Sequence, residues 1–216
     1  MQKFECTAIL FDLDGVLVDS TAAVGRAWHR WAMKHGLEPA AVVHAAHGRR
    51  TIETMRALAP HLDSDDEART MENEESRDLE GVTAIPGADQ LLRSLPAGQW
   101  AIVTSGTRTM ATARLRDTGH LVPPVLVTAD DVADGKPHPE PYLKGAKGLG
   151  IAPELCVVFE DAPAGIRAAH AAGMRVIALT TTFPLRELHE ADAVVANFND
   201  VRVERSPDGN LAIFVD

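Results

Sequence analysis

The stretch ILFDLDGVLVDS, residues 9–20, decides the fold of this chain. The segment from Cys6 to Leu13 is rich in apolar and β-branched residues and ends at two acids, Asp12 and Asp14, which Gly15 follows. This pattern predicts a buried strand that runs into a turn. Side chains two residues apart lie on the same side of a strand, so both carboxylates should face one point beyond its carboxyl end. Two adjacent carboxylates repel each other, and a fold that keeps them needs a cation or a shared proton.

Length and composition fit one large domain, or one domain that carries an insertion. The chain has 216 residues, of which 45% are hydrophobic and 24% charged. The net charge of −10 disfavours a nucleic-acid surface, which needs clustered Lys and Arg. No apolar run approaches the ~20 residues of a membrane span, and the start MQKFEC lacks the apolar stretch of a signal peptide. We therefore expect a cytoplasmic protein without nucleic-acid or membrane partners, either a monomer or a weak homodimer.

The two cysteines, Cys6 and Cys156, both lie in predicted strands beside apolar neighbours. Reduced, buried thiols are the expected state, and a disulfide is the alternative.

Residues 18–84 interrupt the sheet with a helical composition. Helices are predicted over residues 21–36, 39–46 and 51–58, and the acidic stretch 63–80 is typical of the solvated face of one or two helices. No strand is predicted in this segment.

From residue 86 onward, predicted helices and strands alternate, and they include a strand over residues 124–132 and a short helix over residues 184–191. Strands separated by helices pair in parallel through right-handed crossovers, with helices on both faces. The fold class is therefore α/β: a Rossmann-like parallel core, residues 1–17 and 85–216, with an inserted all-helical cap, residues 18–84. The tail should form a hairpin around residues 207–210. Because ligands of such sheets bind beyond the carboxyl ends of the strands, the insert is positioned to act as a lid.

Polar groups follow the other predicted strands as well. A hydroxyl and free backbone N–H groups after one strand can hold an anionic oxygen, a proline-stiffened loop carries a lysine, and a second acidic pair ends a later strand. The residues concerned are Thr104, Ser105 and Gly106, then Lys136, then Glu160 and Asp161. Each signal alone is common in surface turns and helix caps, whereas their succession at the ends of strands of one sheet is not.

The four carboxylates of Asp12, Asp14, Glu160 and Asp161 would bind a hard divalent cation through oxygen if they converge. Mg²⁺ is the expected ion, because it tolerates few protein ligands and shares a substrate phosphate.

The chain resembles the haloacid dehalogenase superfamily over nearly its whole length. The segments DLDGVLVDS, VTSG, GKPHPEP and VVFEDAPAG are similar to its four motifs, in the subgroup whose helical cap follows the first motif. The segments HGRRTIETM and FEDAPAGI resemble more narrowly the bacterial sugar phosphatases and the yeast glycerol-phosphate and 2-deoxyglucose-6-phosphate phosphatases. These relatives differ in what they hydrolyse, so the resemblance leaves the sugar or polyol phosphate open.

The resemblance implies a Mg²⁺-dependent phosphomonoester hydrolase that forms an aspartyl-phosphate. Asp12 would be the nucleophile, and Asp14 would protonate the leaving oxygen and then activate water. The metal would be held by Asp12, the backbone carbonyl of Asp14 and Asp161, with Glu160 a direct or an indirect ligand. Ser105 or Thr104, together with Lys136, would complete the phosphate cradle.

The cap loop of His47, Gly48, Arg49 and Arg50 is the main basic feature of the insert. By resemblance to relatives that use this loop for specificity, His47, Arg49 and Arg50 are expected to contact substrate. A solvated loop between helices is the alternative.

Other reactions of the superfamily fit less well. A dehalogenase has no leaving alcohol to protonate and lacks an acid at the position of Asp14. The β-phosphoglucomutases carry a catalytic histidine where this chain has Val24, and phosphonate hydrolases need a cap lysine, whereas Lys34 is the only lysine between residues 18 and 85. A phosphoglucomutase-type phosphotransferase and an idle sugar-phosphate-binding regulatory module remain as alternatives.

Overall fold

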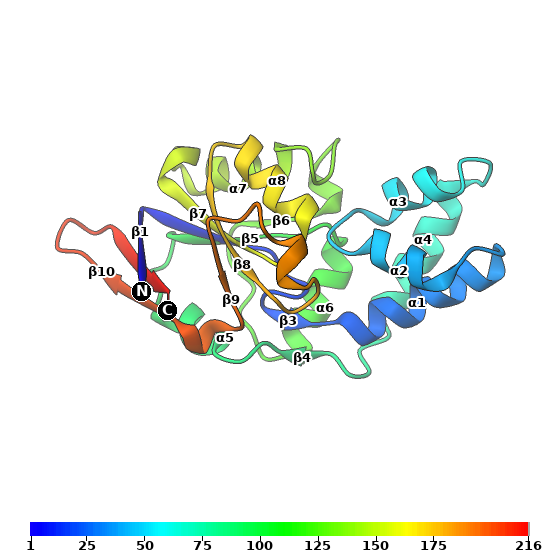
Figure 1. Ribbon diagram of the computed structural model, residues 1–216, viewed down its shortest axis with the longest axis horizontal. Helices are drawn as coiled ribbons and strands as arrows, with labels where there is room; N and C mark the ends of the chain where they lie inside the picture. Colours follow the sequence, from blue (N-terminus) through cyan, green and yellow to red (C-terminus); the bar gives the residue numbers. More distant parts are fainter. Residues whose placement is uncertain (216) are drawn as a thin grey trace.

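A six-stranded parallel sheet forms the centre of the computed structural model, which describes residues 1–215 (Figure 1). Its strands are β2 (Ala8–Phe11), β5 (Trp100–Val103), β6 (Leu126–Val127), β7 (Cys156–Glu160), β8 (Arg175–Leu179) and β9 (Ala193–Val195). The strand order is β6-β5-β2-β7-β8-β9, so the direction of strand addition reverses at β2. Ligands of open parallel sheets bind beyond the carboxyl ends of the strands at such a reversal. The predicted α/β class is confirmed.

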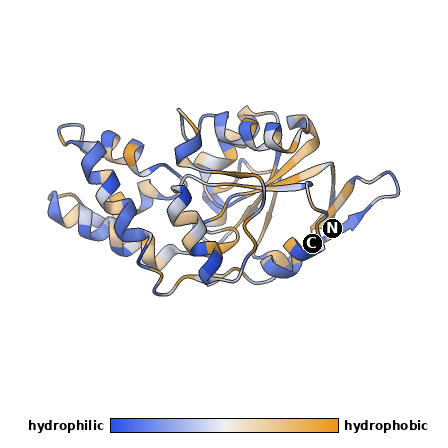
Figure 2. Ribbon diagram, turned by 180° about the vertical axis from the view of Figure 1, so that it is seen from behind, coloured by the Kyte–Doolittle hydropathy of each residue, from blue (hydrophilic) through white to orange (hydrophobic). Residues whose placement is uncertain are grey.

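Side-chain alternation along β2 divides the core into two layers. Ile9 and Phe11 pack with residues of the helices on one face, and Ala8 and Leu10 pack with residues of the helices on the other. The first face is covered by α5 (Ala88–Ser94) and α6 (Arg108–Asp117), the second by α7 (Glu140–Leu149) and α8 (Pro163–Ala171). Figure 2 shows the apolar strands between helices whose outer faces are hydrophilic. A strand that is buried on both faces reads as a continuous apolar run, as β2 does.

The insert consists of four helices with a hydrophobic core of their own. They are α1 (Thr21–Lys34), α2 (Pro39–Ala46), α3 (Thr51–Leu58) and α4 (Ser64–Glu75). Trp28 and Trp31 of α1 are buried together with Met55 and Met71, which lie on two other helices of the insert. The helical spacing of the apolar residues in α1 produces this buried stripe. Figure 1 shows these helices to one side of the sheet, beyond the ends of its strands.

Two short strands lie where the chain enters and leaves the insert. β3 (Val18–Asp19) pairs antiparallel with β4 (Thr83–Ala84). The expectation that residues 18–84 contain no strand is therefore wrong at both ends. Two residues are too few to show a period of two, and their pairing joins positions far apart in the sequence. Both connections of the insert consequently run side by side.

The predicted strand from Cys6 to Leu13 is in fact divided, and its first part belongs to another sheet. β1 (Gln2–Cys6) pairs antiparallel with β11 (Leu211–Val215), which pairs in turn with β10 (Val201–Arg205). Thr7 lies between β1 and β2 and donates its N–H to the carbonyl of Leu155. The apolar run continues across this break, so composition did not reveal it. The hairpin predicted around residues 207–210 is confirmed by the β10–β11 pair.

Two other predicted elements are shorter than expected. The strand predicted over 124–132 is limited to β6, because Thr128 and Asp131 form a capping box that begins a 3-10 turn. The helix predicted over 184–191 is a single 3-10 turn. The 3-10 turns are η1 (Ala129–Asp131), η2 (Pro153–Leu155), η3 (Leu185–Glu187) and η4 (Phe198–Asp200).

Cys6 and Cys156 are both free and buried, as predicted. Burial raises the pKa of the Cys6 thiol to about 12 and that of Cys156 to about 11, so neither is a thiolate at neutral pH. Within residues 1–215, no helix combines the length and the apolar character that a membrane span requires.

Candidate active site

Lys136 lies at the centre of a buried ionic cluster beyond the ends of β2, β5 and β7. Its Nζ donates to Asp12 Oδ1 at 2.8 Å, to Glu160 Oε1 at 2.7 Å and to the carbonyl of Val103 at 3.1 Å. These bonds use all three N–H donors of the ammonium, which is 1% exposed. The fold thus brings the lysine to both predicted acidic pairs, although Asp12 is 124 positions away in the sequence.

Both oxygens of Glu160 are engaged within the protein. Oε1 also accepts a hydrogen bond from the Tyr142 hydroxyl at 2.9 Å. Oε2 accepts from the backbone N–H groups of Asp161 and Ala162 at 2.8 and 2.9 Å. Glu160 therefore orients Lys136 and fixes the start of α8. Sequence reasoning missed Tyr142, although a lone tyrosine on an apolar helix face is a signal that its hydroxyl has a buried partner.

Asp161 is buried, and its Oδ1 has no hydrogen-bond partner among residues 1–215. Asp12, Glu160 and Asp161 each offer one carboxylate oxygen within 4.8 Å of the others. Three carboxylates face one ammonium here, which leaves an excess of buried negative charge. An unpartnered buried oxygen in such a set fits a hard divalent cation bound through oxygen.

The pKa shifts in this cluster follow from burial and from the charge excess. Burial raises the pKa of Asp12 against the opposing effect of Lys136. Burial, and then repulsion by Glu160 and Asp12, raises the pKa of Asp161 well above its ordinary value. Burial alone would lower the pKa of Lys136, but the two adjacent carboxylates raise it, so the lysine stays charged. A bound cation would oppose the upward shifts of the two aspartates.

Gly15 allows the chain to pass directly beside Asp161. Its φ is +78°, and a Cβ at this position would lie 1.8 Å from Asp161 Oδ2. Only glycine satisfies both the left-handed backbone and the close approach.

Asp14 is held by two groups that sequence reasoning did not identify. Its Oδ1 accepts hydrogen bonds from Arg114 Nη1 at 2.6 Å and from Ser20 Oγ at 2.7 Å. Arg114 lies on the buried face of α6, beside Met110 and Leu115, and is 1% exposed. An arginine at helical spacing with apolar residues was the available signal, because a buried guanidinium requires an anionic partner.

Thr104, Ser105 and Gly106 directly follow β5. Thr104 Oγ1 accepts from the N–H of Gly106 at 3.0 Å, and Ser105 Oγ donates to the carbonyl of Gly48 at 3.1 Å. The small cavity, of about 60 Å³, is lined by these three residues of the β5 end together with Asp12 and Asp14.

The cap loop reaches this cavity with two of its three basic residues. His47 and Arg49 line the small cavity. Arg50 does not line it: its Nη1 donates to Glu53 Oε1 at 3.2 Å and to the carbonyl of Ala133 at 2.9 Å. Arg50 thus joins the cap to the loop before Lys136 and lines a separate hollow.

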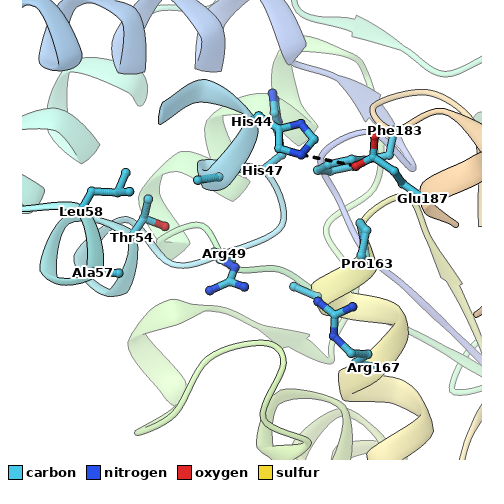
Figure 3. Close-up of a pocket in the computed structure, with 12 residues that line it drawn as sticks. His44, His47, Arg49, Thr54, Ala57, Leu58, Pro163, Arg167, Phe183 and Glu187 are labelled. Carbon is cyan, nitrogen blue, oxygen red and sulfur yellow. Dashed lines mark ion pairs between the residues drawn. The ribbon is translucent and has the colours of Figure 1, made fainter. Parts of the chain in front are cut away.

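A second, wider cavity of about 340 Å³ lies beside the first and shares His47 and Arg49 with it. Figure 3 shows Arg49 between cap residues such as Thr54 and core residues such as Arg167. His44 of the cap and Glu187 of the core form an ion pair across its rim, with 3.3 Å between Nε2 and Oε2 (Figure 3). Burial lowers the pKa of His47.

The parallel sheet, with an acidic cluster at its reversal point, is the architecture on which the comparisons bear. Residues 6–173 match the family model of haloacid dehalogenase-like hydrolases. The chain belongs to this family, as its motifs predicted, and it is an enzyme.

Two relatives that are similar in sequence over nearly the whole chain are named as phosphatases. Hexitol phosphatase A of Escherichia coli (strain K12) is 45% identical over 213 residues, which cover 96% of this chain and 99% of that protein. Glycerol-1-phosphate phosphohydrolase 2 of Saccharomyces cerevisiae is 39% identical, with 93% of this chain and 86% of that protein covered. The crystal structure of β-phosphoglucomutase from Clostridium difficile superposes with a TM-score of 0.79 at 26% identity, covering 91% of this chain and 93% of that chain.

Proposed function

We propose that this enzyme hydrolyses small sugar or polyol phosphates through an aspartyl-phosphate on Asp12. The observation that carries the proposal is the buried cluster of Asp12, Lys136, Glu160 and Asp161 at the reversal point of the sheet. The named substrates of the relatives, hexitol and glycerol phosphates, support the substrate class.

Asp12 acts as the nucleophile. Lys136 engages Oδ1 only, which leaves Oδ2 to attack phosphorus. The new bond joins Oδ2 to phosphorus, and the bond between phosphorus and the ester oxygen breaks. A carboxylate needs no base to become nucleophilic once it is ionised, and the charge of Lys136 favours the ionised form.

Asp14 transfers the protons. It protonates the departing ester oxygen, which leaves as an alcohol, and then takes a proton from the water that hydrolyses the aspartyl-phosphate. Arg114 and Ser20 both bind Oδ1 of Asp14, so they fix the orientation of the carboxylate in the cavity. Inorganic phosphate is the second product.

The remaining groups hold the phosphate and the metal. Asp12, the backbone carbonyl of Asp14 and Asp161 would hold Mg²⁺, which neutralises phosphate charge so that one anion can attack another. Glu160 acts indirectly, because both of its oxygens are already bonded. Thr104, Ser105 and the N–H of Gly106 line the place of the phosphoryl oxygens, and the cap supplies His47 and Arg49. His47 and Arg49 would contact the phosphate or the alcohol part of the substrate.

One residue in the lining of the small cavity favours hydrolysis over transfer of the phosphoryl group to a second sugar. Val24, which stands where the resemblance places the catalytic histidine of the β-phosphoglucomutases, lines this cavity. An isopropyl group can transfer no proton to or from an acceptor hydroxyl.

The test is phosphate release from a panel of phosphomonoesters, with and without EDTA. The wild type should release phosphate from several sugar or polyol phosphates only when Mg²⁺ is present. Asp12→Asn should lose all but trace activity with an intact fold, whereas Asp117→Asn, at an exposed position of α6, should behave as the wild type. Turnover by Asp12→Asn comparable to the control would refute the proposal.

A further inference from the structure

Arg114 and Glu75 form a buried pair that joins the core to the cap. Arg114 belongs to α6, and Glu75 is the last residue of α4; they are 1% and 4% exposed. Arg114 Nη2 lies 3.8 Å from Glu75 Oε2, which is an ion-pair distance but too long for a hydrogen bond.

Several polar atoms of this pair have no partner. Within residues 1–215, no group hydrogen-bonds to Nε or Nη2 of Arg114 or to Oε1 of Glu75. Among these residues, Asp14 is the acceptor for Nη1 of the guanidinium. Buried donors and acceptors are almost always satisfied, because leaving them unpaired is costly. A group from outside the chain is therefore expected between the two side chains.

Both side chains line the small cavity that contains Asp12 and Asp14. Val24 and Trp28 add apolar side chains to the lining of the same cavity. A molecule whose phosphate lies at Asp12 would place the first carbons of its alcohol against this pair.

We propose that Arg114 and Glu75 bind a hydroxyl group of the substrate alcohol, on a carbon next to the ester carbon. This inference rests on the proposed phosphatase function. A hydroxyl accepts one hydrogen bond and donates another, so it can accept from Arg114 and donate to Glu75 at once.

Charge and hydrogen-bonding capacity exclude the other occupants. A second phosphate would be repelled by Glu75 and Asp14, and a cation could not accept a hydrogen bond from the unpartnered N–H groups of Arg114. A neutral group with both a donor and an acceptor fits this arrangement. Hydroxylated alcohols such as glycerol and hexitols satisfy it, and simple alkyl alcohols do not.

The pair also couples recognition to catalysis. Glu75 comes from the cap, whereas Arg114 comes from the core and holds the proton donor Asp14. The hydroxyl is therefore bound only when the cap lies on the core, at the moment when Asp14 must be oriented. Arg114 is a positioning residue for Asp14, and Glu75 is the cleaner site for a test.

The experiment compares glycerol 1-phosphate with propyl phosphate, which has the same three carbons and no hydroxyl. The ratio of their kcat/KM values should be large for the wild type and should fall at least about tenfold in Glu75→Ala. Glu74→Ala, an exposed neighbour on the same helix, should keep the wild-type ratio. Glu75→Gln, which retains an acceptor, should give an intermediate ratio and serves alone if Glu75→Ala does not fold.

The outcomes separate the inference from the function on which it rests. A wild-type ratio near one, or Glu75 variants that slow both substrates equally, would overturn the hydroxyl site and leave the phosphatase intact. Failure of the wild type to hydrolyse either compound, or any other phosphomonoester, would overturn the phosphatase and the inference with it.

Discussion

Lys136 remains charged although it is buried, because two carboxylates face it. Its ammonium satisfies three acceptors at once, and Asp12 and Glu160 would otherwise be buried without a cation. Removing one member of a buried ion cluster leaves the remaining charges buried without a partner. This costs more free energy of folding than replacing the whole cluster by apolar residues.

Lys136→Met should therefore abolish turnover and lower the free energy of unfolding by about 3–5 kcal/mol. Lys144→Met is the matched control on α7, since Lys144 is half-exposed and its ion pair with Glu140 contributes at most ~1 kcal/mol. Urea unfolding in EDTA measures the stability of both variants, and phosphate release in Mg²⁺ measures their turnover. Equal stability of the two variants would show that Lys136 does not hold the cluster together.

Glu75 gives the protein a pH dependence of known sign. Burial raises its pKa from the ordinary 4.5 to about 7. Between these values the native state holds a proton that the unfolded chain has lost, so the free energy of unfolding falls as pH rises. The loss of stability is complete roughly one pH unit above this pKa of about 7.

The side chain of Glu75→Gln is uncharged at every pH, so the free energy of unfolding of this variant does not fall in this way as pH rises. Its stability relative to the wild type should rise between about pH 5 and pH 7.5 by an amount on the order of 3 kcal/mol, and then level off. Urea unfolding at several pH values measures the difference. A difference that does not change with pH would contradict the burial of an ionisable carboxyl at this position.

At the scale of the elements, α8 passes so close to Glu160 that it needs a glycine. A Cβ on Gly165 would lie 1.6 Å from Glu160 Oε1. Glu160 in turn holds Lys136, so the packing of one helix determines the geometry of the ionic cluster.

Gly165→Ala should displace Glu160, cost about 1–3 kcal/mol of stability and lower kcat. Gly25→Ala is the matched control inside α1, where no atom lies within 4 Å of the added methyl group. Alanine is the better helix former, so this control should gain about 0.5–1 kcal/mol. If Gly165→Ala were also stabilising, the close approach of α8 to the cluster would be wrong.

The elements that could be predicted from the sequence are those with long, regular patterns. α2 and α3 begin and end where periodicity and breakers place them, at 39–46 and 51–58. β3 and β4 have two residues each and pair across the whole insert, so no local pattern could reveal them. The break at Thr7 was hidden because apolar residues continue on both sides of it.

The same distinction applies to the site. Asp12, Thr104, Lys136 and Asp161 end strands or lie in a loop rich in proline, where a motif and a turn occur together. Arg114 lies within a helix of the core and reaches the site by packing against Asp14, whereas Glu75 lies within a helix of the cap and reaches it through the packing of cap on core. Their roles depend on contacts that the sequence does not display. Helical spacing could have marked Arg114 as buried, but not which acid it would meet.

At the scale of the whole molecule, the cap meets the core at Gly48. Its φ is +75°, and a Cβ there would lie 2.5 Å from Ala162 Cβ at the start of α8. Ser105 also donates to the Gly48 carbonyl, so the loop is bound directly beside the phosphate residues. This close contact between cap and core is therefore possible only because residue 48 has no side chain.

Gly48→Ala should hold the cap away from the core and reduce kcat/KM by about 10²-fold, the cost of a misplacement near 1 Å. Gly36→Ala is the control in the same insert: its φ is +68°, but no atom lies within 4 Å of the added methyl group. It should lose about 1–2 kcal/mol of stability from the left-handed backbone and retain its activity. Equal activity of both variants would exclude this contact from catalysis.

The central claim is that phosphate passes through a covalent bond to Asp12, and rapid-quench mass spectrometry of the Asp14→Asn enzyme during turnover tests it directly. With p-nitrophenyl phosphate as substrate, the leaving group needs no proton from Asp14, so this variant can still form the intermediate but lacks the base that activates water; the account predicts a phosphoryl group that accumulates on the peptide containing Asp12. Phosphate release without any phosphorylated Asp12, or a phosphoryl group on another residue, would contradict it.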